Sequence, residues 1–185
     1  MLPVGQLMIE HRLIERVIKL WKEYLDKIEK AEVLDMDFIA GGIDFMDVYA
    51  DGCHHGKEEN ILFRDLKNKP LSAELAKILQ ELVDEHDISR NNIKELACAR
   101  ERYISGDRTA FGDIRRAVKT IVDLYPEHIQ KEDKRFFLPC MEYFTPQEQA
   151  SMILEFKEFD RNIIDEKYKS IVGELESAAG LKAKK

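Results

Sequence analysis

Apolar residues recur at intervals of three and four along most of the 185-residue chain. This spacing places them on one face of an α-helix, which has 3.6 residues per turn. No segment shows the strict alternation of apolar and polar residues that is typical of a strand. The pattern predicts four long helices, over about residues 4–29, 37–66, 73–103 and 108–138.

Polar residues mark the expected starts of three helices. Ser72 and Asp107 stand where side-chain caps would begin the third and fourth long helices. Thr145 and Glu148 form a capping box that opens a further helix. We expect this last helix to continue towards Leu175.

Four long helices joined by short turns predict an all-α fold, an up-down-up-down four-helix bundle. We expect residues 1–144 to form this bundle. Residues 145–177 are expected to form an additional C-terminal helix that packs on the bundle. Residues 178–185 are expected to be a disordered tail.

The composition is that of an ordinary soluble domain, with 44% hydrophobic and 35% charged residues. A net charge of −7 without a basic cluster argues against binding to nucleic acid. No apolar stretch is long enough to span a membrane and no signal-peptide core is present, so we expect no membrane contact and a cytoplasmic location. The three cysteines are far apart and odd in number, which suits a reducing compartment better than a disulfide framework.

Four of the five histidines interrupt the apolar stripes, one on each long helix. They are His11, His54, His86 and His128, and the fifth, His55, adjoins one of them. A single histidine on such a face is usually a hydrogen-bonded core residue. Because neighbouring helices of the bundle run in opposite directions, the depths of all four agree with one common layer.

A ten-residue phrase at 54–63 recurs at 128–137. His54 and Glu58 in the first copy correspond to His128 and Glu132 in the second. A spacing of four places the imidazole and the carboxylate on one face of a helix. Two unpaired carboxylates in a core would be costly, and a bound cation would offset that cost.

Five imidazoles and two carboxylates are too many ligands for one tetrahedral zinc ion. They suit two metal ions with the carboxylates as bridges, and donors without thiolate favour iron over manganese or zinc. A second register, with His55 and Glu59 as ligands, is left open by spacing alone. We prefer His54 and Glu58 because only these align with the second copy relative to the phenylalanine that ends each phrase.

The order His, His-x-x-x-Glu, His, His-x-x-x-Glu resembles the pattern of the hemerythrin-like (HHE cation-binding) family, over about residues 5 to 140. The resemblance implies a cofactor of two iron ions, a non-haem di-iron centre with bridging carboxylates and terminal histidines. The ligands it implies are His11, His54, His55, Glu58, His86, His128 and Glu132. Ferritin-like di-iron bundles instead use Glu-x-x-His, and no such pair supports a site here.

Two positions depart from the oxygen-carrying members of that family. Arg90 stands where they have a second histidine on the third helix, and Asp133 adjoins Glu132 at the position of their final aspartate. We expect His55 to replace the missing imidazole only in part, and Arg90 to lie near the pocket and stabilise oxidised states. Arg90, Asp133 and Glu59 are thus candidate outer groups or alternative ligands.

The resemblance implies a small diatomic ligand, chiefly O2 and alternatively NO. The first hypothesis is a protein that binds or senses this ligand rather than an enzyme. The second is a di-iron enzyme or repair factor, which reduces NO or peroxide or donates iron to iron–sulfur clusters. The third is a protein of iron homeostasis. A sensor would need a protein partner or self-association, for which the C-terminal helix is the candidate.

Overall fold

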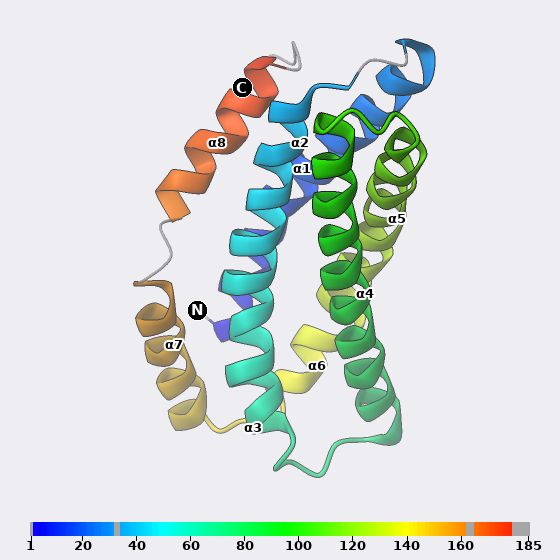
Figure 1. Ribbon diagram of the computed structural model, residues 1–185. Coiled ribbons are helices and arrows are strands. Elements are labelled where there is room, and N and C mark those ends of the chain that lie inside the picture. The colour runs from blue at the N-terminus through cyan, green and yellow to red at the C-terminus, as the bar shows by residue number, and fades with distance from the viewer. Residues whose placement is uncertain (1, 32–33, 162–164, 179–185) are drawn as a thin grey trace.

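The structure is a computed structural model that describes residues 2–31, 34–161 and 165–178, and these residues contain no strand. Four long helices lie side by side with alternating direction (Figure 1). The first and third are single elements, α1 (Pro3–Ala31) and α4 (Ala73–Ile104). The all-α bundle predicted from the sequence is confirmed.

The second and fourth long helices each change their winding along the way. The second comprises α2 (Met36–Asp44), the π-helical turns η1 (Phe45–His55) and η2 (Glu58–Phe63), and α3 (Arg64–Leu66). The fourth comprises α5 (Ala110–Lys131), the π-helical η3 (Glu132–Phe136) and α6 (Phe137–Met141). Periodicity did not predict these π turns, which are rare and concentrate at functional sites.

Two further helices, α7 (Pro146–Asp160) and α8 (Asp165–Ala178), pack along one side of the bundle against α1 and the second long helix (Figure 1). The helix that opens at residue 146 thus ends at Asp160 and does not continue unbroken towards Leu175. The predicted disordered tail lies outside the described residues, except for Ala178, which ends α8. No helix in the described ranges is long and apolar enough to cross a membrane.

The capping residues behave as predicted in two of three places. The Ser72 hydroxyl accepts from the Leu75 amide, and Thr145 and Glu148 form the reciprocal capping box. The predicted cap at Asp107 is wrong. Its carboxylate accepts from the amide and hydroxyl of Thr109 in a turn, so the helix begins only at 110. A short acidic side chain can close such a turn as readily as it caps a helix.

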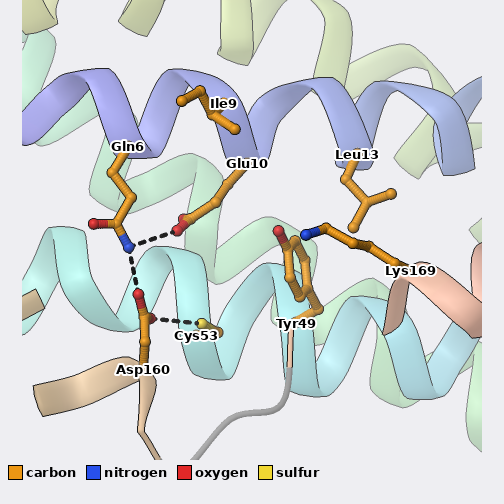
Figure 2. A pocket seen from close by; sticks show the side chains of 8 residues that line it. All are labelled: Gln6, Ile9, Glu10, Leu13, Tyr49, Cys53, Asp160 and Lys169. Atoms are coloured by element: carbon orange, nitrogen blue, oxygen red, sulfur yellow. Dashed lines mark hydrogen bonds between the residues drawn. The ribbon is translucent and has the colours of Figure 1, made fainter. Parts of the chain in front are cut away.

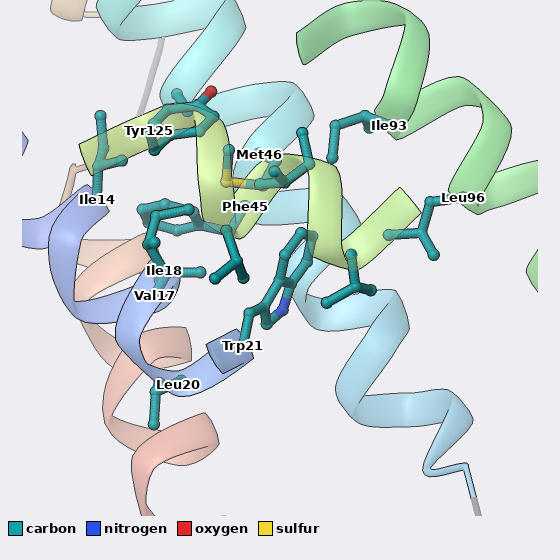
Figure 3. Packing of buried hydrophobic residues seen from close by; sticks show 14 of the residues in the cluster. Ile14, Val17, Ile18, Leu20, Trp21, Phe45, Met46, Ile93, Leu96 and Tyr125 are labelled. Atoms are coloured by element: carbon teal, nitrogen blue, oxygen red, sulfur yellow. The ribbon is translucent and has the colours of Figure 1, made fainter. Parts of the chain in front are cut away.

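Two hydrophobic clusters fill the bundle and leave a polar layer between them. The cluster in Figure 3 surrounds the fully buried Trp21, with Phe45 and Leu96 among its members. The second cluster, at the other end, includes Phe63 and Phe136. The described histidines and the two inner glutamates lie between the clusters, where apolar walls exclude water.

Candidate metal centre

The inward stripes of the four long helices meet in one buried layer of imidazoles and carboxylates. Each of the residues that contribute to it is at most 3% exposed. The layer contains His11 from α1, His54, His55 and Glu58 from the second long helix, His86 from α4, and His128 and Glu132 from the fourth. The seven candidate ligands named from the sequence are therefore all brought together.

Nine nitrogen and oxygen atoms in this layer have no hydrogen-bond partner among the described residues. They are the Nε2 atoms of all five histidines and both carboxylate oxygens of Glu58 and of Glu132. Unsatisfied buried polar atoms are costly, and a native core contains few of them. Nine that converge in one layer fit a site built around cations.

The ligand atoms divide into two groups, and within each group they lie no more than 4.8 Å from one another. One group is formed by three imidazoles, from His55, His86 and His128. The other is formed by His11, His54, Glu58 and Glu132. We call them the three-histidine group and the two-histidine group.

Both glutamates reach from one group to the other. Glu58 places Oε1 3.5 Å from His54 Nε2 and Oε2 3.4 Å from His86 Nε2. Glu132 places Oε2 3.0 Å from His11 Nε2 and 3.3 Å from His128 Nε2. Each carboxylate thus touches a histidine of either group, which is the arrangement that a bridge between two cations needs.

The π turn η1 explains how two consecutive histidines can both face inward. Neighbouring residues of an α-helix are about 100° apart around the axis. A π turn has more residues per turn and reduces that angle, so His54 and His55 enter different groups from one backbone. Glu59 does not enter the layer: it accepts from His86 Nδ1 at 2.7 Å and from Arg90 Nη2 at 2.6 Å.

A shell of carboxylates fixes the orientation of the five imidazoles. Each histidine points Nε2 inward and donates from Nδ1 to an acid, at distances of 2.7 to 3.2 Å. The pairs are His11–Asp133, His54–Glu10, His55–Asp51, His86–Glu59 and His128–Glu85. An outer carboxylate of this kind fixes the tautomer and raises the basicity of a metal-binding imidazole.

Four of these pairs form a ring around the bundle. An acid next to an inward residue on one helix holds the histidine of the next helix. Glu10 of α1 accepts from the histidine of the second long helix, and Glu59 of that helix accepts from the histidine of α4. Glu85 of α4 accepts from the histidine of α5, and Asp133 of the fourth long helix closes the ring by accepting from the histidine of α1. Glu10, Asp51 and Glu85 were not predicted from the sequence as members of the site. The sequence signal that could have found them is their position relative to the histidines. Glu10 and Glu85 directly precede His11 and His86, and Asp51 precedes His55 by four residues.

A third layer of basic side chains neutralises the outer carboxylates. Arg12 pairs with Asp133, Lys57 with Glu10, Arg90 with Asp51 and Glu59, and Lys131 with Glu85. The ammonium of Lys57 is fully buried, whereas the other three cations keep contact with solvent. The centre therefore consists of three concentric shells. The innermost is the layer of imidazoles and inner carboxylates, which we call the donor layer, and the outer acids and then the basic side chains surround it.

Arg90 lies outside the layer of imidazoles and carboxylates. Its guanidinium binds Asp51 at 2.8 Å and Glu59 at 2.6 Å, so it points to outer acids and not into the donor layer. His55 lies beside His86, with ring centroids 3.8 Å apart, and joins the three-histidine group. His55 thus brings a third imidazole to this group from the second helix, and Arg90 contacts Asp51, the acid that accepts from His55.

Burial controls the charges in the donor layer. It lowers the pKa of His54, His55 and His86, which keeps these imidazoles neutral, the form that binds metal. Burial and then the charge of Glu132 raise the pKa of Glu58 well above its ordinary value. Without a cation the protein therefore favours a protonated Glu58.

The other carboxylate and His11 shift in opposite directions. Burial alone would raise the pKa of Glu132, but the adjacent His128 and His11 outweigh it and hold the pKa below its ordinary value. Burial alone would lower the pKa of His11, but Asp133 and Glu132 outweigh it and raise the pKa to about 9. The metal-free layer thus holds protons where bound cations would replace them.

Comparison with known proteins gives one finding. The family model described as the hemerythrin HHE cation binding domain matches residues 2–138, a span that includes every candidate ligand. Searches of curated proteins and of solved structures returned no match.

Proposed function

This chain belongs to the hemerythrin HHE cation binding domain family, and from this premise we propose that it is a non-haem di-iron protein that binds or senses a small diatomic ligand, O2 or NO. In this proposal each histidine group holds one iron. The terminal ligands are His55, His86 and His128 for one ion and His11 and His54 for the other, with Glu58 and Glu132 as bridges.

The observation that carries the proposal is the set of nine unpartnered buried atoms. A core of hydrogen-bonded histidines would leave few such atoms, because each one costs free energy. Two divalent cations would give every one of these atoms a partner and would compensate the two carboxylate charges. Imidazole and carboxylate donors without thiolate favour iron, with manganese and zinc as weaker candidates.

The unequal groups support a division of labour. With both carboxylates as bridges, the three-histidine group offers five protein donors and the two-histidine group four. The ion with fewer protein donors keeps more room for an external ligand, so we assign ligand binding to the side of His11 and His54. Bound iron would supply an exchangeable coordination position and a reversible change of oxidation state, which capture of O2 or NO requires.

The protein's own residues prepare that site. The hydrophobic clusters on either side exclude water, and the outer acids keep each Nδ1 proton in place so that Nε2 stays free to bind. In this proposal both carboxylates and every Nε2 atom of the layer would be engaged as metal ligands, so none of them would be left to transfer a proton, which favours binding over catalysis. Reduction of NO or peroxide, donation of iron, and iron homeostasis are alternatives that would use the same centre.

The first test is metal content. Anaerobic reconstitution with ferrous iron should yield two ions per chain, measured by metal analysis after removal of free metal. A stoichiometry near one, or retention of zinc in competition with ferrous iron, would overturn the di-iron proposal.

The second test concerns the ligand. Exposure of the ferrous protein to O2 or NO should produce new absorption bands in the near-ultraviolet and visible range. An optical spectrum that does not change with either gas would contradict ligand binding while leaving the metal site intact.

A further inference from the structure

The end of α7 lies directly on the part of the second long helix that carries the ligands. Phe156 of α7 is fully buried. A Cβ atom added to Gly56 would lie 2.8 Å from Cζ of Phe159, so this ring would have to shift to make room for a larger residue. Gly56 stands between His55 and Lys57, and α7 is therefore seated one residue from a candidate ligand. The glycine that weakens the helix locally permits this close approach.

The last residue of α7, Asp160, enters a partly buried polar cluster beside the donor layer. One of its oxygens lies 2.5 Å from Lys57 Nζ and 3.2 Å from Cys53 Sγ. Its other oxygen accepts from Gln6, which also donates to Glu10. Figure 2 shows Asp160 pointing from α7 towards Gln6 and Cys53, at a cavity of about 180 Å³.

Lys57 connects this cluster to a candidate ligand. Its ammonium, 0% exposed, is shared between Asp160 and Glu10. Glu10 in turn accepts from Nδ1 of His54 at 2.9 Å. The side chains of Asp160, Lys57, Glu10 and His54 thus form one line of contacts from α7 to the two-histidine group.

The other cations of the outer shell differ in their second partner. Arg12 also pairs with Glu15, and Arg90 with Asp87, each on its own helix. Lys131 also pairs with Glu81 of α4, inside the bundle. Among these four cations as the structure describes them, Lys57 alone takes its second acid from outside the four-helix bundle.

We propose that Asp160 is a positioning residue for the two-histidine metal, so that the docked α7 sets how strongly this metal is held. The inference rests on the proposed di-metal function. Asp160 draws Lys57 away from Glu10, which leaves more of the Glu10 charge to pull on the Nδ1 proton of His54. Asp160, Lys57 and Glu10 also carry one net negative charge next to the cation. Both effects strengthen binding by His54.

The test is a stepwise anaerobic titration with ferrous iron against a competing chelator. The step that disappears in His11→Ala identifies the two-histidine metal. Asp160→Asn keeps the size of the side chain and removes its charge. It should weaken that step by about five-fold, less than the roughly 10–100-fold typical of a direct outer partner, and leave the other step unchanged. The matched control is Glu155→Gln, which removes the ion pair between α7 and Arg64 on the second long helix and should change neither step.

A double variant separates charge from structure. Lys57→Met with Asp160→Asn leaves Glu10 as the single charge of the line, so the net charge returns to that of the original protein. The affinity of the two-histidine step should recover to within about two-fold of the original value if the coupling is electrostatic. If α7 acts only as packing, the double variant would bind no better than Asp160→Asn.

The outcomes are distinct from those that test the function. An unchanged Asp160→Asn titration, equal weakening of both steps, or no recovery in the double variant would overturn the positioning role. An original protein that binds fewer than two ions would instead overturn the proposed function.

Discussion

The two histidine groups sit in one layer but are supported from different parts of the molecule. The acids behind the three-histidine group are held by Arg90 and Lys131, which reach solvent and pair within the bundle. One acid behind the two-histidine group, Glu10, is held by the buried Lys57, which α7 covers through Asp160. The acids of the first group are thus held within the bundle, whereas one acid of the second group is also linked to α7.

This difference fits the proposed division of labour. The ion with five protein donors needs only a rigid frame, which helices with solvated outer ion pairs can supply. The ion that keeps an open position relies more on the basicity of its two imidazoles. One of them, His54, is oriented by Glu10, whose cation Lys57 is shielded from water. Shielding strengthens electrostatic interactions because the local dielectric is low.

The largest effect is expected where the two groups meet. Glu58→Gln removes a bridge that touches both groups, so both ferrous ions should be lost or weakened by more than about 100-fold. His55→Ala should affect only the three-histidine ion and leave about one ion per chain. Metal analysis of the reconstituted variants measures this. If His55→Ala loses metal as completely as Glu58→Gln, the alternative assignment becomes the better interpretation. In that assignment His55 and Glu59 are the primary ligands, in place of His54 and Glu58.

The second-largest effect is expected at Gly56, where α7 packs on the second long helix. Gly56→Ala forces a Cβ against Phe159. Overpacking of this kind costs about 1–3 kcal/mol, which should outweigh the gain of about 1 kcal/mol that alanine brings in helix propensity. The matched control is Gly112→Ala in α5, where an added Cβ meets no atom within 4 Å, and alanine there should be neutral or stabilising. Chemical denaturation of both variants measures the change. Equal stabilities would show that α7 is not seated tightly on the ligand-bearing helix.

A substitution of Arg90 tests the support of the three-histidine group from within the bundle. Arg90→Met leaves Asp51 and Glu59 without their cation and loosens the orientation of His55 and His86. The three-histidine ion should bind about 10-fold more weakly, which is about 1.4 kcal/mol, and the two-histidine step should not change. Loss in both steps of the titration would mean that the groups are not supported separately.

The smallest effect concerns the metal-free protein. Its Glu58 has a pKa above the unfolded value, so the folded state binds more protons and stability falls as pH rises through that interval. Burial of His54, His55 and His86 gives the opposite slope below the ordinary pKa of histidine, because their folded pKa values are lowered.

Glu58→Gln isolates the carboxylate from those histidines. The metal-free variant should melt higher than the metal-free original protein, by about 2–4 °C per kcal/mol of stabilisation, and the gap should widen from pH 5 to pH 8. Thermal unfolding in the presence of chelator measures it. A gap that stays constant over this range would contradict the raised pKa.

Much of the centre could be predicted because its determinants are local. The spacing of His54 and Glu58, repeated at His128 and Glu132, places each pair on one face of its helix whatever the neighbours do. The apolar stripe around His11 has the same property. These periodicities determined the bundle and the seven inner side chains, whereas their role as ligands and the division of the chain at residue 144 stay predictions.

The outer shells could not be predicted in the same way. Whether Glu85 meets His128, or Glu10 meets His54, depends on the relative rotation and depth of two helices, which no single helix encodes. The contacts of Arg90 with Asp51 and Glu59 have the same cause, because both acids lie on another long helix. The π-helical winding of η1 was also not predicted, because a π turn is a small local departure from the α-helix that tertiary packing stabilises.

The sequence by itself thus determined the four helices, the inward faces and the donors on them, because helical periodicity acts within one element. The tertiary structure alone decided which acid orients which imidazole, that His55 joins His86 and His128 in one group, and that Asp160 reaches Lys57. These are contacts between segments far apart in the chain, and their geometry is fixed only when the helices pack against one another.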